Sequence, residues 1–133
     1  MGISSLRIEV ENKIKTWANS KNPVIPISYE SVPFTKPDTT WIEVFIIPAM
    51  TDNTTLSMQR KTLKGIIQIN LYTKDGVGTK LSETLAEEII NILPATAKSQ
   101  NLSIEKTGYI MSPVKDAQWR VTPIRFEYRQ ESY

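Results

Sequence analysis

The stretch AQWRVTPIRFEYR, residues 117–129, decides the fold of this chain, because its apolar side chains alternate in two phases that are one residue out of step. The first phase comprises Trp119 and Val121, and the second comprises Ile124, Phe126 and Tyr128. A strand has a two-residue period, so a change of phase predicts an extra residue in the ladder. We therefore predict a β-bulge at Thr122-Pro123, one of the few places within a strand where proline is tolerated.

Two segments earlier in the chain have the apolar spacing of amphipathic helices. The first begins at Ile3 and ends near Asn19, and the second runs from about Thr79 to Leu93 and stops before a proline. Ile8 lies on the otherwise polar face of the first helix. It is either an isolated exposed residue or a contact with a neighbouring subunit.

The other apolar segments alternate as strands do. They are residues 25–29, 40–47 and about 59–73, followed by shorter runs within 102–113 and by the final strand. Pro23 and Pro26 predict that the first of these is short or lies at a sheet edge. Residues 50–58 contain many turn formers and predict a long hairpin loop. The order helix, strand, strand, strand, helix, strand, strand predicts an α+β fold, with two helices on one face of a mixed, mainly antiparallel sheet in a single domain, residues 1–133.

The composition excludes several classes of catalyst. The chain has no Cys and no His, which rules out Ser-His-Asp and Cys-His nucleophile systems and zinc sites built from thiolate or imidazole. A net charge of +2, spread along the chain, is not typical of a dedicated nucleic-acid binder. We find no apolar run of about 18 residues and no signal peptide. We expect a soluble protein made inside the cell, without catalytic residues, metal or cofactor.

The glycine turn, Gly76-Val77-Gly78-Thr79-Lys80, joins a strand to a helix, where backbone amides can hold an anion. It lacks the spacing of a phosphate-binding P-loop, and Thr79 and Lys80 stand in the reverse order. The turn is therefore better explained as a flexible connection. A small anion- or nucleotide-binding protein that uses residues 76–80 remains the alternative from another functional class.

One candidate contact surface is basic. Arg60, Lys61 and Lys64 form the densest basic cluster, at the edge of the long hairpin loop, and are either a solvated strand end or a docking element. Arg120 and Arg125, on the last strand, are expected on the side away from the core. They either protect an exposed edge or form salt bridges with another subunit.

A second candidate surface is apolar. Trp41 and Phe45 share a face of their strand with Ile47, opposite the face that the helices are expected to cover. Core packing is the default explanation for these residues. The sheet nevertheless has more apolar area than two helices on one side require, and this surplus favours oligomerisation.

Taken in order, the segments YESVPFTKP, TWIEVFIIP, GIIQINLYTKDGVGTK, LSETLAEEIINIL and WRVTPIRFEYR resemble the tail terminator proteins of long-tailed bacteriophages. The resemblance covers nearly the whole chain and rests on pattern, not on one fixed motif. It implies a non-enzymatic subunit of a six-membered ring that caps the tail tube, ends tube polymerisation and forms the surface that joins the head.

The partners implied by this resemblance are further copies of the chain, the tail tube protein and a head-tail connector or head completion protein. DNA is expected only in passage through the ring, and no membrane is involved. The implied location is the virion tail at the head-tail junction, after synthesis in the cytoplasm of a bacterial host by a phage or prophage. A head-tail connector or a tail completion protein is the alternative within this class.

Overall fold

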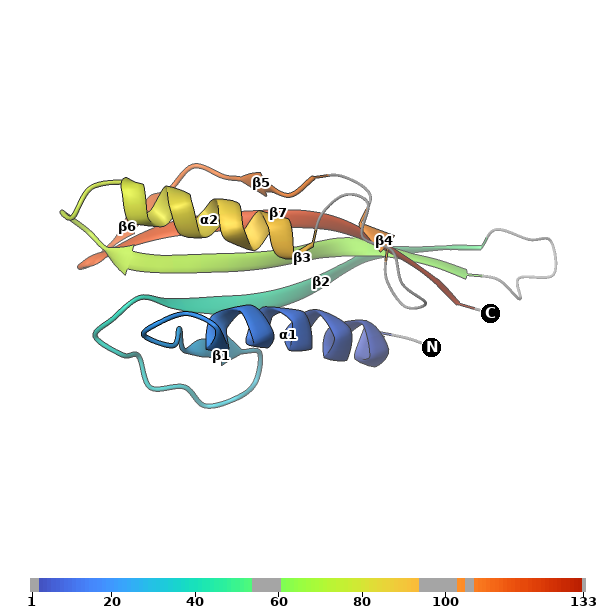
Figure 1. Ribbon diagram of the computed structural model, residues 1–133. Helices are drawn as coiled ribbons and strands as arrows, with labels where there is room; N and C mark the ends of the chain where they lie inside the picture. Colours follow the sequence, from blue (N-terminus) through green and yellow to red (C-terminus); the bar gives the residue numbers. More distant parts are fainter. Residues whose placement is uncertain (1–2, 54–60, 94–102, 105–106, 133) are drawn as a thin grey trace.

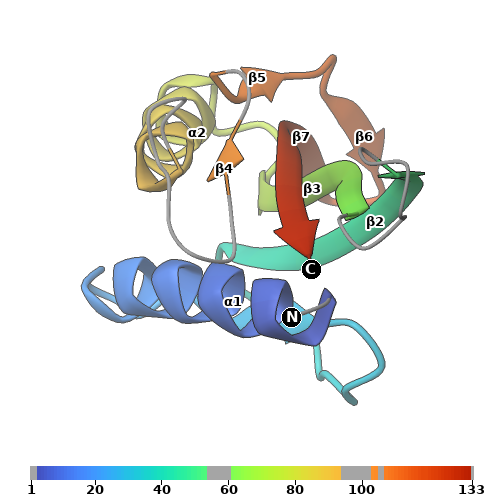
Figure 2. The ribbon, with the colours of Figure 1, turned by 90° about the vertical axis from the view of Figure 1, so that its right-hand side faces the viewer.

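The computed structural model describes residues 3–53, 61–93, 103–104 and 107–132. Helix α1 spans Ile3–Asn19 and helix α2 spans Lys80–Ile92, in agreement with the predicted helices. Both pack on the same face of a twisted sheet (Figure 1). Viewed along the strands, α1 lies beneath β2, and β5 lies at the far edge of the sheet, beyond β7 (Figure 2).

The described residues form a seven-stranded sheet in the order β1-β2-β3-β7-β4, and β5 and β6 also pair with β7. The strands are β1 (Ile27–Tyr29), β2 (Trp41–Asn53), β3 (Lys61–Lys74), β4 (Ser103–Ile104), β5 (Tyr109–Ile110), β6 (Val114–Asp116) and β7 (Trp119–Ser132). Strand β1 is parallel to β2 and every other pair is antiparallel, which confirms the mixed, mainly antiparallel α+β fold. Residues 50–53, predicted as loop, belong to β2, and the run before β7 contains three short strands.

The predicted β-bulge at Thr122-Pro123 is wrong. Strand β7 pairs with β3 in an unbroken register from Lys61 opposite Ser132 to Lys74 opposite Trp119. The phase of the apolar residues changes because the buried side chains move from one face of the sheet to the other. One set packs beneath the helices, and the other belongs to a second cluster on the opposite face.

Proline is tolerated at position 123 because the sheet is interrupted beside it. The amide of Met111 donates to the carbonyl of Pro123 at 2.8 Å, in a pair where proline has no N–H to return the bond. Strand β5 ends at Ile110 and β6 begins at Val114, so the proline ring lies beside a gap in the ladder. The register shift of the sheet occurs instead in β2, between Pro48 and Met50.

The main core lies between the helices and the sheet. One stripe of α1 is fully buried, and it consists of Leu6, Val10, Ile14 and Ala18. It meets three rows of alternating side chains, comprising Ile42, Val44 and Ile46 of β2, Ile67, Ile69 and Leu71 of β3, and Ile124, Phe126 and Tyr128 of β7. Burial of each large apolar side chain contributes about 1.5–3 kcal/mol. Leu81, predicted on the apolar face of the second helix, is 46% exposed, whereas Ser82 beside it is buried.

Two carboxylates fix the helices in place. Glu30 accepts hydrogen bonds from the backbone amide of Ile46, at 2.8 Å, and from Arg7 of α1, at 2.9 Å. Glu88 of α2 accepts from the indole N–H of Trp17, at 3.1 Å, and from Lys21. Each carboxylate therefore joins α1 to a different element, β2 in one case and α2 in the other.

Gly65 is required by the close approach of three chain segments. A Cβ atom at this position would lie 2.6 Å from the Tyr128 hydroxyl and closer still to the carbonyl oxygen of Ile47. We expect Gly65→Asn to lower the free energy of unfolding by about 3 kcal/mol, measured by urea denaturation. Gly78→Asn is the control, because a Cβ atom there would meet nothing within 4 Å and asparagine adopts positive φ more readily than most residues with a side chain, so that only a small backbone strain is expected. Equal losses for the two variants would contradict this account.

The carboxylate of Glu88 should make stability depend on pH. The hydrogen bond from Lys21, followed by that from Trp17, holds the pKa of Glu88 below its usual 4.5 against the opposing effect of burial. Its contribution is therefore complete above the unfolded-state pKa and is lost as pH falls through the lower folded-state pKa. Because the Glu88 side chain is 36% exposed, solvent screens its interactions, and Glu88→Gln should destabilise the protein at pH 7 by about 0.5 kcal/mol. The difference should shrink below about pH 4.5, in chemical denaturation across pH. The exposed neighbour Glu87→Gln serves as the control and should show neither effect.

Candidate assembly surfaces

Three strands extend past the ends of both helices and form a distal arm, defined as residues 50–53 of β2, 61–64 of β3 and 129–132 of β7 (Figure 1). The arm begins at the register shift in β2, and such shifts increase the local twist of a strand. Lys64 and Arg129 are direct cross-strand partners, so the arm carries two adjacent cations on one face. Arg60 lies outside the described residues, and Lys61 is described only as a strand residue opposite Asn53 and Ser132.

The sheet face that turns away from the helices, called here the second face, carries a hydrogen-bonded row of half-buried polar side chains. This polar ladder consists of Tyr72, Glu43, Asn70, Gln68 and Arg125. Tyr72 donates to Glu43 at 2.6 Å, and Arg125 donates to Gln68 at 2.8 Å. Burial, and then the hydrogen bond to Glu43, raise the pKa of Tyr72 well above its usual value. The phenol is therefore a permanent donor in this row at neutral pH.

One end of the second face is covered by the chain itself. Trp41 stacks on Tyr72 with 3.9 Å between ring centroids and meets Trp119 edge-on at 6.3 Å. The segment before β2 lies over this aromatic cluster, with Phe34 5.1 Å from Trp41. Trp41 is only 1% exposed, so this predicted interface residue lies inside the subunit.

The middle of the second face is less covered than the end. Phe45 is half-buried there and Ile47 is 44% exposed. The predicted apolar surplus is thus divided between a covered aromatic cluster and a partly open strip along β2. A role for Phe45 in subunit contact stays a prediction.

Arg120 and Arg125 of the last strand, both predicted on the side away from the core, lie on opposite faces of the sheet. Arg125 is on the second face, within the polar ladder. Arg120 shares the helix face with Ile124 and pairs with Thr73, because β7 contains no bulge. The expectation that both arginines lie away from the core is therefore wrong for Arg120. Ile8 is 62% exposed on α1, as its place in the polar stripe predicted.

The glycine turn is open to solvent. Gly76 and Gly78 have φ values of 92° and 89°, which explains why glycine occupies both positions. A Cβ atom at either position would meet nothing within 4 Å, and every residue from 75 to 80 is exposed. A connection with no surrounding wall gives a phosphate little protection from water, so the geometry favours the simple β-to-α connection.

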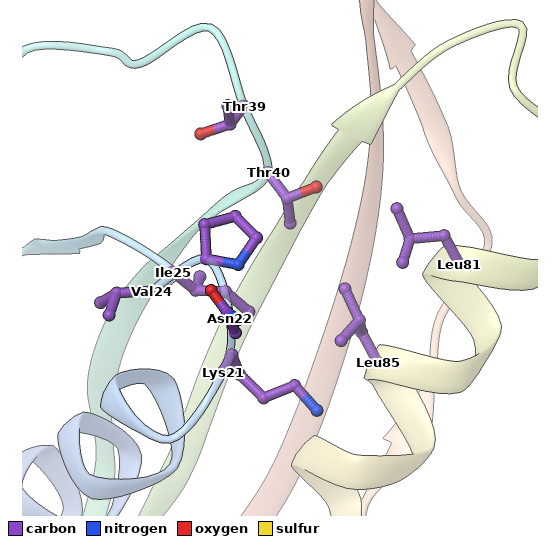
Figure 3. A pocket seen from close by; sticks show the side chains of 9 residues that line it. Lys21, Asn22, Val24, Ile25, Thr39, Thr40, Leu81 and Leu85 are labelled. Carbon is purple, nitrogen blue, oxygen red and sulfur yellow. The ribbon is translucent and has the colours of Figure 1, made fainter.

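A cleft of about 230 Å³ lies between the end of α1, the segment before β2 and the start of α2 (Figure 3). Val24, Ile25, Leu81 and Leu85 supply apolar walls, and Lys21 and Asn22 lie at its border. Sequence analysis missed this cleft, because it forms where three segments distant in sequence meet. Within the described parts of the chain, no group of three or more acidic side chains is placed to hold a metal ion. Neither described helix has the length and apolar character needed to cross a membrane.

A family of known proteins matches most of the chain. The model of the phage tail terminator protein family matches residues 5–128. The chain belongs to this family. Terminator proteins of this family are structural components of the phage tail, and the resemblance drawn from the sequence is confirmed.

Solved structures share the fold of this terminator-family chain. One, a protein that carries no functional name, aligns with a TM-score of 0.82 at 20% identity and covers 100% of this chain and 98% of its own. Another belongs to the virion of a native gene transfer agent particle, with a TM-score of 0.62 at 15% identity and 92% coverage of both chains. No curated protein sequence matches.

The polar ladder should stabilise the sheet through the Tyr72 hydroxyl. Tyr72→Phe keeps the stacking on Trp41 but removes the donor to Glu43, leaving a half-buried carboxylate with a weaker set of partners. We expect a loss of about 1 kcal/mol in urea denaturation. The control is Tyr109→Phe, at a position that is 41% exposed, and it should be neutral. If Tyr72→Phe left the free energy of unfolding unchanged, the Tyr72 hydroxyl would not contribute to stability.

Proposed function

We propose that this chain caps the phage tail tube as a homo-oligomeric ring, ending the addition of tube subunits and presenting the surface to which the head is joined. The observation that carries the proposal is the family match over residues 5–128. The structural neighbour in a gene transfer agent virion is consistent with a place in such a particle. In this proposal the chain acts by assembly and not by catalysis, and its partners are further copies of itself, the tube protein and a head-side connector.

The distal arm is the element proposed to dock on the tube. To end a polymer, a protein needs one surface complementary to the growing tip and another that does not reproduce that tip. The arm projects from one end of the subunit, away from both helices (Figure 1). Lys64 and Arg129 face the same side of it, so that side of the arm suits an acidic rim.

The decisive experiment removes the protein from an assembling phage and measures tail lengths by electron microscopy. We expect tails of irregular and excessive length, because nothing stops tube addition. Tails of normal, uniform length that fail to join heads would instead identify a connector or completion protein.

Complementation then tests the arm. Lys64→Glu should fail to restore uniform length, whereas Lys80→Glu, at an exposed position in the glycine turn, should restore it. Both variants make the same change of charge, so a difference between them reports on the arm. Full restoration by Lys64→Glu would remove the arm from the docking model.

A further inference from the structure

Among the described residues, six of the nine exposed large apolar side chains form two sets, and the other three, Ile47, Val77 and Leu81, lie on the second face, in the glycine turn and at the start of α2. The two sets lie at opposite sides of the sheet, where α1 and β1 form one side and β5 and β6 form the other (Figures 1 and 2). The α1–β1 side carries Ile8, Val24 and Val32, which are 62%, 55% and 55% exposed. The β5–β6 edge carries Tyr109, Ile110 and Val114, which are 41%, 42% and 57% exposed.

We propose that these two sides meet, so that the β5–β6 edge of one copy packs against the α1–β1 side of the next. This inference rests on the ring of the proposed function and specifies how its subunits join. A ring needs a head-to-tail contact between two different surfaces of the same chain, whereas a two-fold dimer needs one surface that contacts itself. The subunit offers two such surfaces, each apolar and each on its own side.

The charges of the two sides are complementary. On α1, Lys15 lies two turns from Ile8 on the same face of the helix and is exposed. On β6, Lys115 is paired with Asp75 at 3.3 Å within the subunit, and the exposed Asp116 beside it can attract a cation of the neighbour. Opposite charges at the border of an apolar contact favour the head-to-tail register over contact between like sides.

The strand edges also disfavour contact between like sides. Pro23 and Pro26 precede β1, and Pro113 lies between β5 and β6, so both sheet edges are short and interrupted by residues without an N–H. Extended pairing of an edge with its own copy is therefore poor. Side-chain packing of one side against the other does not have this restriction.

Aspartate substitution tests the contact through the oligomeric state. Val114→Asp places a charge in the proposed interface at a position exposed in the single subunit, and Val77→Asp, at the 66% exposed tip of the glycine turn, is the matched control. We expect Val114→Asp to need a protein concentration at least tenfold higher than the natural chain to reach the same mass in light scattering. Val77→Asp should show the same concentration dependence as the natural chain. Equal thermal unfolding of both variants would show that folding is intact.

Cysteine cross-linking tests the pairing directly, because the natural chain has no Cys. Proteins with the single changes Ile8→Cys and Val114→Cys are mixed and treated with a short bis-maleimide. We expect dimers that contain one chain of each kind, little linkage in either protein alone, and a ladder of higher species from the double variant. Val77→Cys should not link to either partner.

The outcomes separate this inference from the ring itself. If the natural chain forms oligomers that Val114→Asp leaves intact, or if Val114→Cys links mainly to itself, the proposed contact is wrong and the ring stands. If the natural chain stays monomeric both in solution and on tail tubes, the ring and this contact both fail.

Discussion

The unbroken pairing of β3 with β7 determines most of the structure. These two strands form the centre of the sheet, and every short strand near the end of the chain is attached through β7. Because the register never shifts between them, the face of each side chain on both strands is settled by simple alternation. Helix packing, the aromatic cluster and the polar ladder all follow from that alternation. A shift of one residue would exchange the apolar rows beneath α1 and α2 for polar side chains.

The two faces of this sheet are buried by different means. The helix face is covered by long elements with continuous apolar stripes, whereas the second face is covered at one end by a short segment and carries a hydrogen-bonded row in its middle. The polar row lets the middle of the sheet face water without unpaired groups.

The prediction from sequence was correct for elements with strong periodicity. It was wrong where two different structures produce the same pattern of apolar residues. The stripe from Leu6 to Ile14 repeats with helical spacing, so α1 was predicted with correct ends. The phase change at Thr122 was misinterpreted because a bulge and a change of buried face look alike in sequence. That error carried over to Arg120, whose face depends on the same count. Trp41 was placed correctly on the second face, but its cover comes from a loop that has no periodic signal.

The aromatic cluster has a further consequence for how the subunit can be observed. Trp41 and Trp119 lie together beneath the loop segment on one face, while Trp17 contacts Glu88 between the two helices on the other. The chain has three tryptophans, so its intrinsic fluorescence divides into one emitter for the helical layer and a coupled pair for the opposite layer. Single replacements would therefore give a separate optical signal for each layer, without any added label.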